Sequence, residues 1–210
     1  MTEKHLEVKK TARYYTLGEL SVQTEKIFFV LHGYGMNAKD FLASFQPLAN
    51  DKNFIVAPEA LNRYYLKMAG GVVGATWMTR EDRLNEMKDY INYLEDLYLH
   101  VVPANSKARI TVLGFSQGSS TATRWVNASK QKIDALIDYA GEVAPELLPL
   151  SPDSGLRKTK NIFICGTDDE YFTPPLVAEM KVKYADMNFT EVEFKGKHVI
   201  NTEALIPFFV

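Results

Sequence analysis

Three residue types that could act as nucleophile, base and acid each follow an apolar stretch of the sequence. Ser116 stands between Gly114 and Gly118 in "LGFSQGSS", a G-x-S-x-G spacing at the end of an apolar run. A sharp corner from strand to helix needs small neighbours, and it exposes the serine hydroxyl where a helix N-terminus stabilises developing negative charge. A serine N-cap with incidental glycines is the alternative interpretation.

The candidate base and acid follow the last two apolar runs. His198 lies in "KGKHVI" after "TEVEF", and Asp168 and Asp169 lie in "GTDDEYFTPP" after "KNIFIC". Neutral imidazole can take the proton of a weakly nucleophilic hydroxyl, and a carboxylate can hold that imidazole in one tautomer. A turn that favours aspartate and a surface histidine are the alternatives. The order serine, aspartate, histidine, each after its own strand, is typical of hydrolases.

A glycine-rich turn is the candidate for stabilising negative charge on a substrate oxygen. The run "KIFFVL" is followed by His32, Gly33, Tyr34 and Gly35. Glycines allow backbone amides to point into a cavity, so the N–H groups of Tyr34 and Gln117 are predicted to form an oxyanion hole. A turn without catalytic use is the alternative. We expect His32 to be structural, because these glycines direct the backbone and not the ring.

Alternating strands and helices are expected to position these residues. Short apolar runs predict strands, and longer amphipathic stretches between them predict helices. The alternation predicts an α/β fold with a mainly parallel sheet, whose strand carboxyl ends gather the binding and catalytic groups. The predicted strands are 26–31, 53–57, 108–113, 133–140, 160–165 and 190–194, and the predicted helices include 38–50, 116–129, 174–187 and 201–210.

Two further elements are predicted before the serine motif. "ARYYTL" and "ELSVQT", separated by Gly18, indicate an N-terminal hairpin. A capping box of Thr79 and Asp82 is expected to open a long helix that Pro103 ends. Its apolar face is predicted to contain residues at helical spacing: Leu84, Met87, Ile91, Leu94, Leu97, Tyr98 and Val101.

Composition limits the classes of partner and location. The 210 residues, 46% of them hydrophobic, suit one domain over 1–210 without a large lid domain. A net charge of −2 argues against nucleic acid as a partner. Cys165, in an apolar run, is expected to be a buried inert thiol. No secretory signal, no membrane-spanning run, no metal-ligand spacing and no cofactor fingerprint is visible, so we expect a cytoplasmic protein without metal or cofactor.

Four motifs together resemble a known family. "VLHGYG", "GFSQGSS", "GTDDEYFTP" and "GKHVI" look like the small α/β-hydrolases of the phospholipase/carboxylesterase group, which includes acyl-protein thioesterases. The resemblance runs in order from about residue 27 to the end. It implies an α/β-hydrolase fold with Ser116 as nucleophile, His198 as base and the N–H groups of Tyr34 and Gln117 as oxyanion hole.

The resemblance also bears on the acid and on the substrate. In that family the acid lies three residues after the glycine that ends its strand, which here gives Asp169 and leaves Asp168 to shape the turn. Family members usually carry a valine-proline pair after the acid, where this chain has Phe172-Thr173-Pro174. This departure leaves the triad in place but leaves the acyl pocket, and so the substrate, open.

Two loops, 59–79 and 141–155, are expected to flank the serine. Trp77, Val143 and Phe172 are the predicted pocket residues, and their apolar character suits an acyl group. Side chains that only cover the sheet are the alternative, and the glycines of the first loop would allow a mobile flap. A small soluble acyl ester or thioester is the preferred substrate of a serine carboxylesterase or thioesterase. A peptidase, a lactone hydrolase and a non-catalytic binding module are the competing hypotheses, and the oligomeric state stays open.

Overall fold

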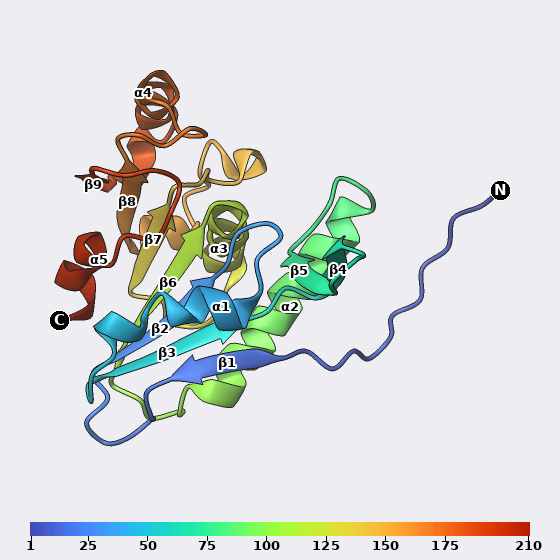
Figure 1. Cartoon of the computed structure of the whole chain (residues 1–210), viewed down its shortest axis with the longest axis horizontal. Coiled ribbons are helices and arrows are strands. Elements are labelled where there is room, and N and C mark those ends of the chain that lie inside the picture. The colour runs from blue at the N-terminus through green and yellow to red at the C-terminus, as the bar shows by residue number, and fades with distance from the viewer.

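The central sheet has seven strands, in the order β1-β3-β2-β6-β7-β8-β9 (Figure 1). The computed structural model describes all residues from 1 to 210. Most strands coincide with the apolar runs of the sequence, because a strand covered on both faces is apolar on both sides. The strands are β1 (Tyr14–Leu17), β2 (Lys26–Leu31), β3 (Asn53–Pro58), β6 (Arg109–Phe115), β7 (Ala135–Tyr139), β8 (Lys160–Gly166) and β9 (Thr190–Phe194).

The register of the parallel strands brings their carboxyl ends to one edge of the sheet. Leu31 of β2 pairs with Gly114 of β6, and Gly114 pairs with Asp138 of β7. Gly166, which ends β8, pairs with Phe194, which ends β9. The turns that follow β2, β6, β8 and β9 therefore lie along the same edge, where α/β sheets gather their ligands.

Helices cover both faces of this sheet, as the predicted α/β architecture requires. Phe28 and Phe29 of β2 point to opposite faces, since successive strand side chains alternate. Phe29 packs edge-on against Trp125 with ring centroids 5.3 Å apart, and Phe28 stacks on Phe209 at 3.7 Å. The helices on the Phe29 face are α2 (Arg83–Val101), α3 (Gln117–Ala128) and α4 (Pro174–Lys183), and those on the Phe28 face are α1 (Ala38–Ala43) and α5 (Thr202–Phe209).

The predicted N-terminal hairpin is wrong. β1 pairs antiparallel with β3, with Tyr15 opposite Ala57, and residues 19–24 contain no strand. Gly18 turns the chain at φ 83°. The polar segment that follows forms hydrogen bonds within itself instead of pairing as a strand. The N–H of Ser21 donates to Thr24 Oγ1 at 3.0 Å, and the N–H of Thr24 donates to the Ser21 carbonyl at 3.2 Å.

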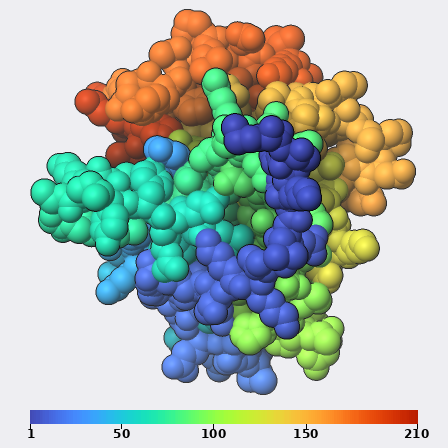
Figure 2. Space-filling view, turned by 90° about the vertical axis from the view of Figure 1, so that its right-hand side faces the viewer, coloured from blue at the N-terminus to red at the C-terminus, as the bar shows by residue number.

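The glycine-rich loop predicted at 59–79 is instead a two-stranded antiparallel hairpin. Its strands are β4 (Asn62–Lys67) and β5 (Val72–Thr76), and they form a sheet separate from the central one. Gly70 and Gly71 make its tip with φ values of 94° and 65°. Figure 2 shows the hairpin, in turquoise, projecting from the left of this face.

The long helix α2 begins differently from the prediction. No capping box forms, because Asp82 adopts a left-handed conformation and makes no side-chain cap. Glu86 instead accepts a hydrogen bond from the N–H of Thr79 at 2.6 Å. Leu84, predicted on the apolar face, is 72% exposed. The buried face of the helix consists of Tyr90, Leu94, Leu97 and Tyr98.

Two other predicted helices are shorter than expected. The helix predicted at 38–50 ends at Ala43, and Pro47 lies in a separate 3-10 turn of Gln46–Leu48. The helix predicted at 174–187 ends at Lys183 and is followed by the 3-10 turn Ala185–Met187. None of the helices combines the length and the apolar character that a crossing of a membrane requires.

Candidate active site

Ser116 stands at the corner between β6 and α3 with no loop residue on either side. Its backbone has φ 54° and ψ −118°, a strained conformation for a residue with a Cβ. Both flanking positions must be glycine, because neighbouring backbone leaves no room for a Cβ atom at either one. A Cβ on Gly114 would lie 2.3 Å from the carbonyl oxygen of Gly118, and a Cβ on Gly118 would lie 2.3 Å from the carbonyl oxygen of Leu31. The G-x-S-x-G spacing is thus a consequence of packing the helix start against β6 and β2.

Asp169 and His198 are joined by a hydrogen bond. The Nδ1 atom of His198 donates to Asp169 Oδ2 over 2.8 Å, and the Asp169 side chain is fully buried. The other carboxylate oxygen accepts from the N–H groups of Tyr171 at 2.9 Å and Phe172 at 3.0 Å. These bonds turn the carboxylate inward, toward the imidazole. Asp168 is exposed and does not contact the histidine through a hydrogen bond.

Aromatic rings enclose the imidazole of His198. The ring of Phe115 lies 4.8 Å from it, Tyr171 meets it edge-on at 4.9 Å, and Phe172 stacks nearly parallel at 6.0 Å. The imidazole side chain is 14% exposed. Because Nδ1 is held by Asp169, Nε2 is the ring nitrogen left without a protein partner. Sequence reasoning missed Phe115 and Tyr171, although both are immediate neighbours of predicted residues.

The structure brings the serine corner and the histidine loop to the same edge of the sheet. Phe115, which contacts the His198 ring, directly precedes Ser116 in β6. No hydrogen bond joins the Ser116 hydroxyl to the imidazole. In hydrolases, such bonds often tighten only in the complex with substrate. A serine hydroxyl and an imidazole with a free Nε2 are the two groups that general-base activation of a serine requires.

Two backbone N–H groups border the same corner. Tyr34 lies in the turn after β2, and its N–H makes no hydrogen bond within the protein. Gln117 is the first residue of α3, where N–H groups have no partner inside the helix. A Cβ on Gly33 would lie 3.3 Å from Ser116 Cβ, so the two turns are in direct contact. Both donors are thus placed next to the serine.

His32 and Cys165 are buried and do not belong to the candidate site. The Nδ1 atom of His32 lies 2.8 Å from the Gly33 carbonyl, and Nε2 accepts from the N–H of Ala60 at 3.1 Å. Burial lowers the pKa of His32, so the ring is neutral and structural, as predicted. Burial raises the pKa of the Cys165 thiol to about 12, which makes it unreactive.

Two of the three predicted pocket residues lie in the core. Val143 is fully buried, and so is Trp77, whose indole donates to the His32 carbonyl at 2.8 Å. The prediction that these two line a substrate pocket is wrong, because each fills the interior between a loop and the sheet. Phe172 is half-buried beside His198. Tyr34 and Tyr171 are exposed and stand at the surface of the candidate site.

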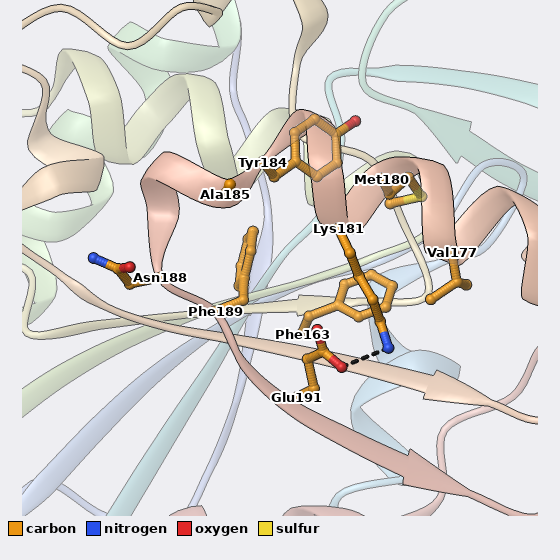
Figure 3. Close-up of a pocket in the computed structure, with 9 residues that line it drawn as sticks. All are labelled: Phe163, Val177, Met180, Lys181, Tyr184, Ala185, Asn188, Phe189 and Glu191. Carbon is orange, nitrogen blue, oxygen red and sulfur yellow. Dashed lines mark ion pairs between the residues drawn. The ribbon is translucent and has the colours of Figure 1, made fainter.

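A pocket in another part of the molecule is separate from the candidate site. It has a volume of about 180 Å³ and lies between α4 and the strands β8 and β9 (Figure 3). Lys181 and Glu191 form an ion pair of 2.6 Å within it. None of the candidate catalytic residues lines this pocket. The lining residues are Phe163, Val177, Met180, Lys181, Tyr184, Ala185, Asn188, Phe189 and Glu191.

One group of side chains has the atoms to ligate a metal ion. Glu3, His5 and Asp82 approach one another on the surface, where the N-terminal segment meets the start of α2. All three are exposed, and exposed acidic groups of this kind are common without an ion. Nothing connects this group to the serine corner.

Comparison with solved structures confirms the fold. Acyl-protein thioesterase 2 from Zea mays superimposes with a TM-score of 0.72 at 16% identity, covering 95% of this chain and 96% of that one. Esterase PE8 gives 0.68 at 20% identity, with 95% and 97% covered. The Bacillus cereus carboxylesterase gives 0.67 at 15% identity, with 94% and 92% covered. At such identities the likeness concerns the fold alone.

Comparison of the sequence identifies the family. No curated protein sequence matches the chain significantly. The sequence profile described as phospholipase/carboxylesterase matches residues 19–203, which include the serine corner, the acid turn and the histidine loop. Because this match covers most of the chain, the protein belongs to the phospholipase/carboxylesterase family.

Proposed function

We propose that the protein is a serine carboxylesterase or thioesterase that cleaves small acyl esters or thioesters. The observation that carries this proposal is the 2.8 Å hydrogen bond between His198 and a fully buried Asp169, beside a strained serine. A buried carboxylate on Nδ1 stabilises the imidazolium that forms when Nε2 accepts a proton. The family and the esterase-like fold support the same reaction class.

The reaction proceeds in two halves through an acyl-enzyme. The Ser116 hydroxyl attacks the acyl carbonyl while His198 takes its proton, and the N–H groups of Tyr34 and Gln117 stabilise the oxyanion. The intermediate collapses, and His198 protonates the departing alcohol or thiol. Water then attacks the acyl-serine with His198 as base, which releases the acid and restores the hydroxyl.

A fluorophosphonate probe tests the nucleophile. We expect the wild type to be labelled at Ser116 and Ser116→Ala to remain unlabelled, because the probe reacts only with an activated serine. A wild type that stays unlabelled while correctly folded would indicate the non-catalytic binding module instead.

A substrate panel tests the reaction class. p-Nitrophenyl esters, acyl thioesters, lactones and peptide amides are assayed with Ser116→Ala as the blank. We expect turnover of esters or thioesters above the blank. Turnover of amides or lactones alone would replace the proposal by a peptidase or a lactone hydrolase.

A further inference from the structure

The side chain of Gln117 is hydrogen-bonded away from the reaction centre. Its Oε1 accepts from the N–H of Trp77 at 3.2 Å, and its Nε2 donates to the Met78 carbonyl at 2.9 Å and to Thr76 Oγ1 at 3.0 Å. The Thr76 hydroxyl in turn donates to the Met78 carbonyl at 3.0 Å. Every polar atom of the carboxamide therefore binds the segment that leaves β5.

The preceding residues of the same segment hold the turn of Tyr34. The N–H of Gly35 donates to the Ala75 carbonyl, and the N–H of Ala75 donates to the Met36 carbonyl, both at 2.9 Å. The two backbones are so close that a Cβ on Gly74 would lie 2.2 Å from the Gly35 carbonyl oxygen. β5 therefore holds Gly35 directly, and Tyr34 is the residue that precedes Gly35 in the chain.

Trp77 adds a third attachment on the other side of Tyr34. Its indole N–H donates to the His32 carbonyl at 2.8 Å, and its ring lies 5.2 Å from that of His32. The segment from Gly74 to Met78 consequently binds the turn of Tyr34 at both ends. Through the carboxamide of Gln117 it also binds the start of α3.

We propose that Gly74–Met78 is a clamp that sets the separation of the N–H groups of Tyr34 and Gln117, with the Gln117 side chain as its positioning group. The inference rests on the proposed function, since it assigns these two N–H groups to the oxyanion. Donors preorganised around the developing charge lower the barrier, and a small displacement weakens them. The carboxamide acts through the backbone and does not touch the substrate.

The first test replaces the carboxamide by an apolar group in Gln117→Leu. We expect kcat for a p-nitrophenyl ester to fall by about 10- to 100-fold, while KM changes less than about twofold. A boronic acid that forms an adduct with Ser116 places an oxygen in the same hole, so its Ki should rise by the same factor as kcat falls. Titration of active sites by the p-nitrophenol burst normalises each rate to folded enzyme.

A second pair of variants leaves Gln117 intact. Thr76→Val removes the hydroxyl that receives Nε2 and keeps the β-branched shape, so we expect a smaller fall in kcat with unchanged KM. Thr76→Ser retains the hydroxyl and should restore kcat. Amide hydrogen exchange at Trp77 gives a readout independent of activity, since its N–H loses its acceptor in Gln117→Leu and should exchange faster.

The outcomes separate the clamp from the proposed reaction. If the wild type is labelled by the fluorophosphonate probe but Gln117→Leu keeps kcat and the boronate Ki within twofold, the clamp is overturned and the esterase stands. If kcat falls while the boronate Ki does not change, the carboxamide does not act through the oxyanion hole. An unlabelled wild type overturns both.

Discussion

The two adjacent aspartates of the acid turn have different surroundings. Asp169 is buried and bonded to His198, whereas Asp168 is exposed. We expect Asp169→Asn to lower kcat by about 10³- to 10⁴-fold, because an amide favours the wrong tautomer of the imidazole. Asp168→Asn is the matched control and should stay within about twofold. Ester hydrolysis rates check both, and a larger loss in Asp168→Asn would reassign the acid.

Asp138 is a fully buried carboxyl group that the proposed mechanism does not use. Burial raises its pKa to about 7, the charge of Glu142 acts in the same direction, and the Ser119 hydroxyl opposes it. An unfolded aspartate has a pKa of about 3.9, so between pH 4 and 7 the folded protein retains a proton that the unfolded chain releases. The contribution of Asp138 to the free energy of unfolding therefore falls as pH rises through this window and levels off above it.

Asp138→Asn has no such proton to retain. The melting temperature of this variant, relative to wild type, is expected to rise between pH 5 and pH 7. Differential scanning calorimetry at several pH values measures the difference. A difference that is constant with pH would show that Asp138 is ionised in the folded protein throughout.

Sequence reasoning could name the residue types of the site but not their orientation. The family resemblance favours Asp169 over Asp168 as the acid, but the sequence does not show the physical reason. That reason is the pair of bonds from the N–H groups of Tyr171 and Phe172, which turn the Asp169 carboxylate inward. The prediction that Trp77 and Val143 line a pocket fails because loop residues near a serine motif can face either solvent or the sheet. Apolar character alone does not distinguish these two environments.

At the scale of elements, the corner that holds Ser116 depends on close contact between β6, α3 and β2. A Cβ on Gly118 would lie 2.3 Å from the Leu31 carbonyl oxygen, whereas a Cβ on Gly70 would meet nothing within 4 Å. We expect Gly118→Ala to cost about 3 kcal/mol or more in unfolding free energy. Gly70→Ala should cost about 1 to 2 kcal/mol, from its positive φ alone. Urea unfolding measures both, and equal costs would contradict the packing argument.

The β4–β5 hairpin is expected to differ in stability along its length. The N–H groups of Ala75 and Trp77 are bonded to Met36 and Gln117, while Gly70 and Gly71 form an exposed tip. Native-state hydrogen exchange should therefore be slow at Ala75 and Trp77 and fast at the tip. Fast exchange at all four positions would indicate a mobile flap rather than an anchored hairpin.

The central strands could be predicted because each is a continuous apolar run between helical patterns. The hairpin could not, because β4 is largely exposed and lacks an apolar face, so its residues resemble a loop. The N-terminal hairpin failed for another reason. β1 finds its partner in β3, about forty residues later, and local spacing contains no signal for such a pairing.

At the scale of the whole molecule, the serine corner lies at the end of the fourth of seven strands. Three strands flank β6 on each side, and helices cover both faces. The alternation of apolar strand runs with helical patterns was sufficient to predict this arrangement of one sheet between two layers of helices. This alternation predicts that the candidate residues lie at the carboxyl edge of the sheet. It does not predict how closely the turns that carry them approach one another.

The backbone conformation of Ser116 has a consequence for the energetics of the entire chain. A side chain at φ 54° raises the free energy of the folded state, and glycine does not carry this cost. Ser116→Gly and Ser116→Ala both lack the hydroxyl, yet Ser116→Gly should melt about 1 to 4 °C higher, the reverse of the usual order of alanine and glycine. A higher melting temperature for Ser116→Ala would show that the corner is relaxed. Variants selected only for heat resistance should therefore discard this serine, so heat tolerance and turnover compete at a single position.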